Sequence, residues 1–294
     1  MIWPPTGTQP LPIDVVSIQS QVIYGRVGNN VAVPSFMQAG LTVAAVPTVL
    51  LSNTPHYPSL HGGPIPLEWF EGHLNDLALR GGLTQLRAVQ GGYLGSAQQA
   101  RVLAEWIHRQ RGELPKLRVV IDPVIGDHDV GVYVAPELVE VYRRAVLPLA
   151  DVITPNAFEL AQLTGIATQD IEGTIAAART LLHGQIKAVA VTSAAPASWP
   201  AGRMHIVLVE AQVTHLIDHP LIDIAPKGTG DLFAASLCAN WLAGEPLPTA
   251  AQFAAAHVVH ALRVTAQARC AELLLPGFPP EAMKAEVTIR TLPH

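Results

Sequence analysis

The sequence is poor in charge. Only 14% of its 294 residues are Asp, Glu, Lys or Arg, whereas 49% are hydrophobic, and the formal net charge is −5. No run of Lys and Arg occurs in the chain. A protein that follows a nucleic-acid backbone needs a basic stripe, so we expect no nucleic-acid partner. A surface with so few charges is often partly covered by another subunit, so we expect a subunit interface.

Cysteine is also scarce. The two cysteines, Cys238 and Cys270, lie far apart and have no His or Cys neighbour at metal-ligand spacing, so two buried, reduced thiols are expected. Residues 1–12 are rich in Pro, Thr and Gly, unlike a signal peptide. No window reaches the ~18 uninterrupted apolar residues of a membrane span. These absences favour a cytoplasmic protein without membrane contact.

What the chain does contain is a regular alternation of strand-like and helix-like segments. Ile13–Ile18 predicts a first strand, and Leu117–Ile121 predicts a strand that is buried on both faces of a parallel sheet. Pro136–Leu147 predicts a helix, and residues 203–217 predict an antiparallel hairpin. Thr229–Leu242 and Thr249–Thr265 predict the last two helices. This order predicts an α/β fold: a doubly wound, mostly parallel central sheet with helices on both faces.

In such a fold ligands bind beyond the carboxyl ends of the strands. The strongest candidate there is the segment 227–231, which reads Lys-Gly-Thr-Gly-Asp and opens the helix predicted from Thr229. Glycines at a helix entry leave backbone N–H groups accessible to an anion such as phosphate. Asp231 in the first turn could then accept a proton from an attacking hydroxyl. Alternatively, Asp231 only stabilises the helix N-terminus; the spacing leaves both open and excludes only the P-loop pattern.

Two further polar segments follow predicted strands. Asp122 and Asp127 come directly after Leu117–Ile121, where two carboxylates suit Mg²⁺–phosphate chemistry, although a simple polar turn would look the same. Asn156 and Glu159 follow a short strand and have the spacing of a helix capping box. A capping role and an outer-sphere magnesium role are compatible. A fourth segment, 17–29, is interpreted as a polar loop after the first strand that could form the floor of a small-molecule site.

Taken together, these segments resemble the pyridoxal kinase branch of the ribokinase superfamily over residues 13–275. The matching stretches are S-x-Q-S-Q-V-x-Y-G-x-V-G-N at 17–29, V-P-T-V-L-L-S-N-T-P-H-Y at 46–57, G-Y-x-G at 92–95, D-P-V-I-G-D at 122–127, I-T-P-N-x-F-E-L at 153–160, V-T-S at 191–193 and K-G-T-G-D-L-F at 227–233. Within the branch the sequence is most similar to bacterial enzymes that act on all three B6 vitamers. The implied domains are a flexible arm at 1–12, a ribokinase-like kinase domain at 13–275 and a C-terminal tail at 276–294.

The resemblance also implies roles for individual residues. Asp231 is implied as the catalytic base, with an anion hole formed by Gly228, Thr229 and Gly230. Ser20, Val27, His56, Tyr93 and Asp231 are implied to line the B6 pocket, Ser20 by a hydrogen bond to the pyridine nitrogen and Val27 and Tyr93 by packing on the ring. The positions implied to bind nucleotide are Asp122, Thr154, Glu159, Thr192, His219, Pro220, Leu221, Ile222, Lys227 and Thr229; those implied for the metal are Tyr133 and Glu159.

The implied activity is transfer of the γ-phosphoryl group of ATP to the 5′-hydroxymethyl group of pyridoxal, pyridoxine or pyridoxamine. Mg²⁺ accompanies the ATP, and a monovalent cation is compatible with the resemblance. Together with the low fraction of charged residues, the resemblance predicts a homodimer. Two alternatives stay open: a hydroxymethylpyrimidine kinase of thiamin synthesis, and a B6-binding protein without catalysis. An intact Asp231 beside its glycines argues against the second, because a binding protein has no need of a base at an anion hole.

Overall fold

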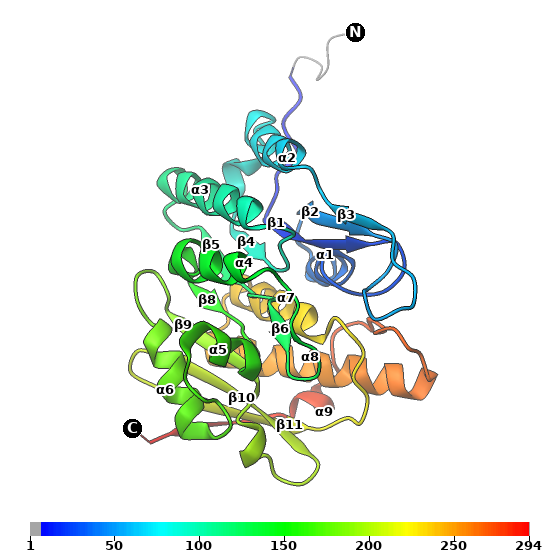
Figure 1. Cartoon of the computed structure of the whole chain (residues 1–294), viewed down its shortest axis with the longest axis vertical. Helices are drawn as coiled ribbons and strands as arrows, with labels where there is room; N and C mark the ends of the chain where they lie inside the picture. Colours follow the sequence, from blue (N-terminus) through cyan, green and yellow to red (C-terminus); the bar gives the residue numbers. More distant parts are fainter. Residues whose placement is uncertain (1–6, 294) are drawn as a thin grey trace.

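The computed structural model describes residues 7–293, so part of the predicted arm, residues 1–6, lies outside the described residues. Within that range one large mixed sheet forms the centre of the molecule (Figure 1), in the order β12-β11-β10-β9-β8-β5-β4-β1-β2-β3. Its strands are β1 (Val15–Val22), β2 (Val43–Leu51), β3 (Gly62–Pro64), β4 (Ala88–Gly91), β5 (Arg118–Ile121), β8 (Val152–Ile153), β9 (Ala188–Ala194), β10 (Arg203–Glu210), β11 (Thr214–Pro220) and β12 (Thr288–Leu292).

The central strands of this sheet are parallel, and its two edges are antiparallel. The pairs β2–β1, β1–β4, β4–β5, β5–β8 and β8–β9 are parallel. The pairs β9–β10, β10–β11, β11–β12 and β2–β3 are antiparallel. A short separate hairpin, β6 (Gly126–Asp127) with β7 (Gly131–Val132), rises from the loop after β5. The predicted fold class, with its mostly parallel central sheet, is confirmed.

Helices cover both faces of the sheet, as predicted. One apolar core packs the helices of the first face against it and includes Phe70, Leu103, Leu138, Leu160 and Ala177. These helices are α2 (Leu67–Leu79), α3 (Ala97–Glu113), α4 (Pro136–Val141), α5 (Ala157–Thr164) and α6 (Ile171–Leu181).

The second core lies on the other face, under α1 (Asn29–Gln38), α7 (Thr229–Leu242) and α8 (Leu247–Ala268). Alternate side chains of β1 enter the two cores: Val16 and Ile18 belong to the first and Val15 to the second. Period-two alternation on a strand explains this division, because successive side chains point to opposite faces. The short helix α9 (Glu281–Lys284) precedes β12.

The structure corrects three details of the sequence interpretation. β1 runs to Val22, so residues 19–22 are strand rather than loop; the buried amide of Gln19 donates to the Ser17 hydroxyl (2.9 Å), which lets polar residues remain in the strand. The helix predicted over 136–147 keeps α-helical pitch only to Val141 and continues as a π turn and a 3₁₀ turn. Cys238 is buried as expected, but Cys270 is exposed, because it follows the end of α8.

The C-terminal segment holds a strand that was not predicted. β12 pairs with β11 over five residues, from Thr214–Leu292 to Asp218–Thr288. The segment before it is rich in Pro, and the sequence around it gave no clear alternation from which a strand could be predicted. None of the helices in residues 7–293 is long and apolar enough to cross a membrane.

Candidate active site

Helix α7 begins at the carboxyl edge of the sheet with an unusual backbone. Gly228 has φ of 97°, in the region that favours glycine, and within residues 7–293 no side chain caps this helix start. A Cβ at Gly228 would lie 2.0 Å from the carbonyl oxygen of Arg26, so only glycine allows the β1–α1 loop (residues 23–28) to pack against the helix entry. The first N–H groups of a helix have no partner within it, and the dipole makes that end positive. An uncapped helix start of this kind has the geometry that a site for an anion requires.

Asp231 lies in the first turn of α7 but does not cap its own helix. Its Oδ2 accepts a hydrogen bond from the Gly28 N–H (2.9 Å), which fastens the carboxylate to the β1–α1 loop. Burial raises the pKa of Asp231, and the Gly28 N–H opposes that rise. The residue as a whole is half-buried. A carboxylate whose pKa is raised is better matched to general-base catalysis than an ordinary one.

Asp122 lies beside the same helix start. It follows β5 directly and is 6% exposed, and its Oδ2 lies 3.5 Å from where a Cβ of Gly230 would stand. Burial raises the pKa of Asp122 well above its usual range, and the nearby carboxylates of Glu159 and Asp231 raise it further. Three acidic side chains from β5, α5 and α7 thus share one small volume, as the ends of neighbouring parallel strands would predict.

Glu159 has the predicted capping geometry. Its Oε2 accepts from the Asn156 N–H (2.9 Å), while the Asn156 side chain accepts from the Glu159 N–H (2.8 Å), which completes a capping box at the start of α5. Its Oε1 accepts from the Ile125 N–H (2.9 Å) in the loop after β5. Burial raises the pKa of this carboxyl, although the backbone N–H groups oppose it. Glu159 therefore joins two loops of the site.

The remaining predicted nucleotide and metal residues lie on neighbouring strands and loops. Lys227 Nζ lies 3.5 Å from Asp127 Oδ2. Thr192, on β9, pairs in a parallel bridge with Asn156, which lies beyond the end of β8. The Thr154 hydroxyl is buried, and its hydrogen bond with Asp122 opposes the rise in the pKa of that carboxyl. The ring of Tyr133 lies 6.5 Å from that of Tyr93. Among residues 7–293 no group of three or more His, Cys, Asp or Glu could hold a metal by itself.

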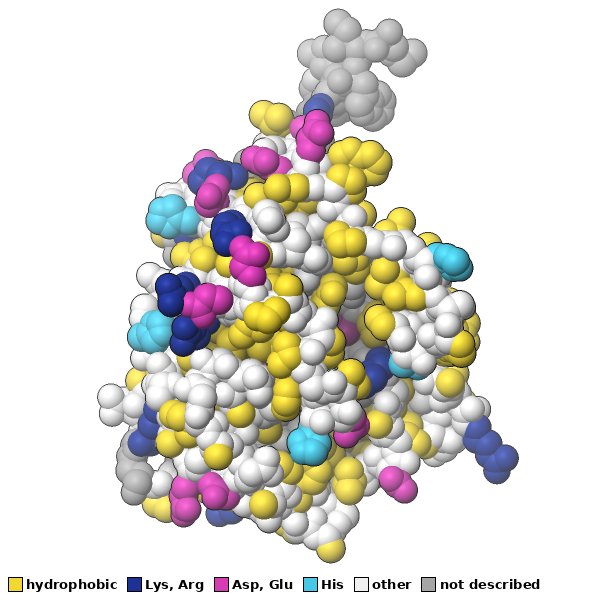
Figure 2. All heavy atoms as spheres, viewed as in Figure 1, with side chains coloured by type: hydrophobic (Ala, Val, Ile, Leu, Met, Phe, Trp, Pro, Cys, Tyr) yellow, Lys and Arg dark blue, Asp and Glu magenta, His cyan; other side chains and the backbone are white. Residues whose placement is uncertain are grey.

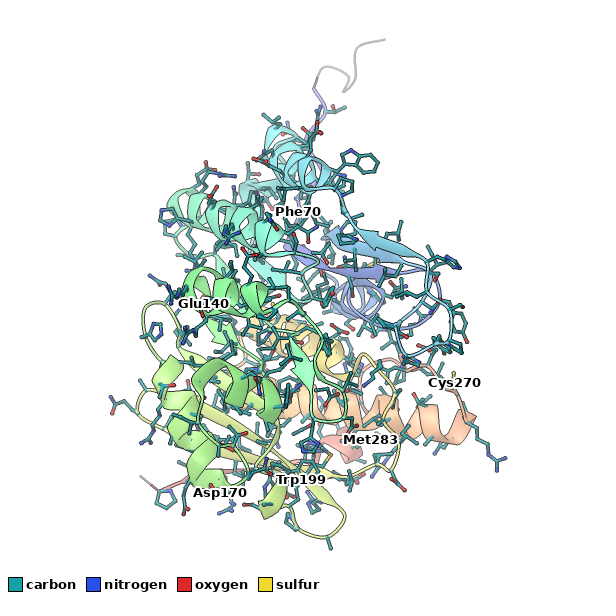
Figure 3. The ribbon with its side chains drawn as sticks, viewed as in Figure 1. Phe70, Glu140, Asp170, Trp199, Cys270 and Met283 are labelled. Carbon is teal, nitrogen blue, oxygen red and sulfur yellow. The ribbon has the colours of Figure 1, made fainter. Side chains whose placement is uncertain are left out.

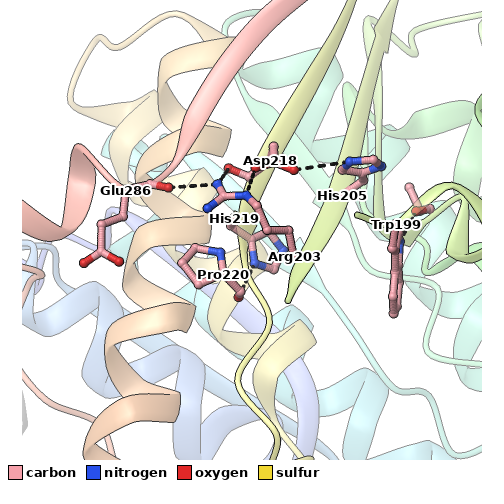
Figure 4. A network of polar contacts seen from close by, with 8 residues as sticks. Trp199, Arg203, His205, Asp218, His219, Pro220 and Glu286 are labelled. Carbon is pink, nitrogen blue, oxygen red and sulfur yellow. Dashed lines mark hydrogen bonds and ion pairs between the residues drawn. The ribbon is translucent and has the colours of Figure 1, made fainter. Parts of the chain in front are cut away.

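Residues 219–222 extend from the end of β11. His219 and Pro220 belong to that strand, and His219 Nδ1 lies 3.1 Å from the Pro220 carbonyl oxygen (Figure 4). Burial lowers the pKa of the His219 imidazole, which favours its neutral form. The strand end is fixed by Arg203, which donates to the side chain and carbonyl of Asp218 and to the carbonyl of Glu286. The predicted nucleotide segment is therefore supported by a polar network from β10, β11 and the C-terminal segment.

The predicted substrate residues come from three separate segments. Ser20 is on β1, 8% exposed, and a Cβ at Gly28 would lie 2.3 Å from its Oγ, so Ser20 and the N–H that holds Asp231 are neighbours. Val27 is on the β1–α1 loop, and Tyr93 follows β4, where the Thr48 hydroxyl donates to its carbonyl (2.7 Å). His56 is on the segment between β2 and β3.

The surface beside β6 is hollowed, and acidic, basic and His side chains line the hollow (Figure 2). This open depression lies beside the strand ends that carry the predicted residues. Cavities of about 300 and 280 Å³ lie elsewhere, near the C-terminal end of α7, and share Asn240 and Phe278.

Sequence reasoning missed one residue of this region. Glu272 follows α8, is 7% exposed and accepts hydrogen bonds from the Arg26 N–H (3.2 Å) and the Tyr57 hydroxyl. It is more than 200 residues away from both partners along the chain. It belongs to no motif, so nothing in the sequence could have identified it.

Comparison with known proteins identifies the family. The phosphomethylpyrimidine kinase family matches residues 40–272. A pyridoxine/pyridoxal/pyridoxamine kinase of Bordetella bronchiseptica is 59% identical over 273 residues, which are 93% of this chain and 96% of that protein. The chain belongs to this family, and the resemblance predicted from the sequence is confirmed.

Solved structures agree with the fold. Pyridoxal kinase from Leishmania donovani in complex with ADP and pyridoxamine has a TM-score of 0.84 and 27% identity and covers 95% of this chain and 99% of its own. A putative phosphomethylpyrimidine kinase from Bacteroides thetaiotaomicron, in a crystal form with pyridoxal, has a TM-score of 0.79 and 25% identity, covering 86% and 88%.

Proposed function

From this family membership we infer that the chain is an ATP-dependent kinase of vitamin B6. It phosphorylates the 5′-hydroxymethyl group of pyridoxal, pyridoxine and pyridoxamine to give the 5′-phosphates, a salvage reaction. The observation that carries this function is the position of Asp231. Its carboxylate is held by the Gly28 N–H at the open start of α7, so a proton acceptor and an anion site lie side by side.

We propose that the reaction is an in-line transfer of the phosphoryl group. The substrate hydroxyl oxygen attacks the γ-phosphorus of ATP, the bond to the β-phosphate oxygen breaks, and ADP leaves. Asp231 takes the hydroxyl proton. The N–H groups at Gly228, Thr229 and Gly230 stabilise negative charge on the transferred group, which is typically worth ~3–4 kcal/mol per donor in other enzymes. Support comes from the uncapped helix start and from the burial-raised pKa of Asp231.

We place the B6 ring between Ser20, Val27, His56 and Tyr93. Ser20 donates to or accepts from the ring nitrogen, while Val27 and Tyr93 pack on the ring faces. The support is the contact of Ser20 with Gly28, which sets this hydroxyl next to the backbone N–H that holds Asp231. A ring bound there would present its hydroxymethyl group to the base.

We place the nucleotide along Thr154, Thr192, Lys227, Thr229 and the 219–222 segment, with Asp122 and Glu159 toward its phosphates. Mg²⁺ fits beside these two carboxylates, because they are hard oxygen donors whose mutual repulsion a cation would relieve. Both Glu159 oxygens already accept backbone N–H groups, so a water-mediated contact suits it. Bound Mg²⁺ would neutralise phosphate charge. The Tyr133 assignment and a monovalent cation remain proposals.

Hydroxymethylpyrimidine phosphorylation is a second candidate. It is favoured by the match to the phosphomethylpyrimidine kinase family and by the similarity to the putative phosphomethylpyrimidine kinase from Bacteroides. One assay separates the candidates. ADP release would be measured with each B6 vitamer, with hydroxymethylpyrimidine and without acceptor, and the phosphorylated products identified by chromatography. Vitamer-dependent ADP release with 5′-phosphate formation is expected. Binding of vitamers without ADP release above the blank would favour the non-catalytic alternative.

We also propose a homodimer that works in the cytoplasm. The low charge fraction supports an interface, and Cys238 and Cys270 are unpaired, as in a reducing compartment. Light scattering over a tenfold dilution series would test the dimer, and a strict monomer at micromolar concentration would contradict it.

A further inference from the structure

Glu272 joins three segments that are remote in sequence. It lies after the end of α8, two residues beyond Cys270, which is labelled at the right of Figure 3. Its Oε2 accepts from the Arg26 N–H (3.2 Å) in the β1–α1 loop. Its Oε1 accepts from the Tyr57 hydroxyl in the β2–β3 segment (residues 52–61) and lies 3.9 Å from His56 Nε2. One buried carboxylate thus holds the two loops that border the hollow.

Aromatic contacts extend this junction. The Tyr57 ring lies 4.3 Å from that of His56 and 5.8 Å from that of Tyr24, centroid to centroid, so it is packed between its neighbour and the β1–α1 loop. The Thr54 hydroxyl lies 2.8 Å from His56 Nδ1 and fixes the orientation of that ring. The Glu272 carboxylate raises the pKa of the Tyr57 phenol through the hydrogen bond between them. Tyr57 is therefore a neutral donor to a carboxylate, a strong class of hydrogen bond.

The junction is connected to the proposed catalytic base through a few residues of backbone. Arg26, whose N–H is held by Glu272, places its carbonyl oxygen against Gly228 at the start of α7. Two residues later, the Gly28 N–H donates to Asp231. A Cβ at Gly25 would lie 2.9 Å from Glu272 Oε2, so the loop approaches the carboxylate closely. Movement of Glu272 would therefore release two segments: the β1–α1 loop, which positions Asp231, and the β2–β3 segment, which carries His56.

We propose that Glu272 is a positioning residue for the acceptor substrate, a clamp that fastens the β2–β3 segment to the β1–α1 loop. This inference rests on the proposed function. Glu272 does not touch the reacting atoms; it sets where His56 and Val27 stand over the B6 ring. The acceptor site depends on both loops. Most of the proposed nucleotide site is built on β5, β8, β9 and β11, and only Lys227 and Thr229 at the start of α7 lie next to the β1–α1 loop. The clamp therefore affects acceptor binding more strongly than nucleotide binding.

Two substitutions separate the contacts of the clamp. Glu272→Ala removes both hydrogen bonds and should raise KM for pyridoxal on the order of tenfold, because that is the loss of affinity expected when about one good hydrogen bond is lost. KM for ATP should change much less. Tyr57→Phe keeps the ring stacking and removes only the hydroxyl donor, so a smaller rise is expected. The double variant should behave like Glu272→Ala alone, because both changes break the same link.

A matched control is Glu281→Ala, which removes a carboxylate that pairs with Lys284 on the surface of α9. Its kinetics should equal those of the wild type. Glu272→Gln retains one acceptor oxygen and should fall between wild type and Glu272→Ala.

Hydrogen exchange supplies a readout that does not depend on activity. In Glu272→Ala, peptides covering residues 23–28 and 52–61 should exchange faster, whereas peptides of β5 and β8 should keep the wild-type rate. If wild-type enzyme phosphorylates no vitamer, the proposed function is wrong, and the exchange pattern still decides the clamp. If wild type is active and Glu272→Ala matches it in both KM and exchange, the clamp is wrong. Equal rises in both KM values or faster exchange everywhere would also overturn it, because they indicate general loosening.

Discussion

The two ends of helix α7 are finished in opposite ways. At its start, Gly228 has positive φ, no side chain from residues 7–293 caps the first N–H groups, and the one acidic side chain of the first turn is committed to Gly28. At its end, Arg87 donates to the Leu242 carbonyl (2.6 Å), and Arg118 donates to the Trp241 carbonyl while its guanidinium lies 4.3 Å over the Trp241 ring.

The difference separates function from stability within one element. Cationic donors at the C-terminal carbonyls satisfy those groups and complement the helix dipole, which stabilises the fold. The same dipole makes the open N-terminus a site for negative charge. A fold selected only for stability would cap both ends. Changes at the two ends should therefore affect different quantities.

The largest effect is expected from Asp231→Asn. The substitution keeps the shape and the Gly28 contact but removes the proton acceptor, so kcat should fall ~10²–10⁴-fold while the nucleotide dissociation constant barely moves. Steady-state kinetics with pyridoxal and nucleotide titration would measure both quantities. Circular dichroism must first show an intact α7. If the variant kept more than about a tenth of wild-type kcat, the loss would be smaller than general-base catalysis typically provides. Solvent would then take the proton.

A glycine pair compares the two ends directly. Gly228 and Gly244 have similar φ values, 97° and 103°, but a Cβ at Gly228 would meet the Arg26 carbonyl, whereas at Gly244 nothing in the described residues lies within 4 Å. Gly244→Ala should cost only the backbone strain, about 1–2 kcal/mol of unfolding free energy. Gly228→Ala should cost more and also lower kcat, because the β1–α1 loop must move.

Denaturant unfolding and kinetics on both variants would measure these effects. Equal losses of stability with wild-type kcat in both would show that the close contact at Gly228 has no catalytic consequence.

Arg118→Met tests the C-terminal end of α7, where Arg118 donates to the Trp241 carbonyl. The loss of a charged hydrogen bond and of the contact with Trp241 should lower the free energy of unfolding by about 1–3 kcal/mol, with kcat unchanged. Arg143→Met removes only an exposed pair with Glu140 and should change stability by about 0–1 kcal/mol. Thermal unfolding of both proteins provides the comparison. A drop in kcat for Arg118→Met, with the folded fraction intact, would break the division between the two ends.

The smallest expected effect concerns pH. Because the folded-state pKa of Asp122 is raised, its stabilising contribution is complete below the unfolded pKa and is lost as pH rises through the folded pKa. Asp122→Asn does not titrate. The variant should therefore gain stability relative to wild type as pH rises from the ordinary carboxyl range through the raised folded-state pKa, without ligands present. Melting temperatures across that range would measure it, and a difference independent of pH would contradict the buried carboxylate cluster.

Short motifs made much of the site predictable. The bounds of α7 were predicted as observed, because an apolar stripe follows the Gly-Thr-Gly-Asp segment at the helix entry. The capping box of Asn156 and Glu159 was likewise local, since its partners are three residues apart. Longer-range features were not predictable: β12 is defined by pairing with β11, and the polar half of β1 is a strand because Gln19 and Ser17 find partners inside the sheet.

The sequence by itself determined the fold class, the family and the residues at the strand ends, because periodicity and motifs act over a few residues. Only the tertiary structure decided how those residues meet. It brought Gly28 to Asp231, set Asp122, Glu159 and Asp231 into one volume where burial raises their pKa, and placed Glu272 between two distant loops. Contacts between segments that lie up to 246 residues apart depend on how the elements pack, and no local pattern records that packing.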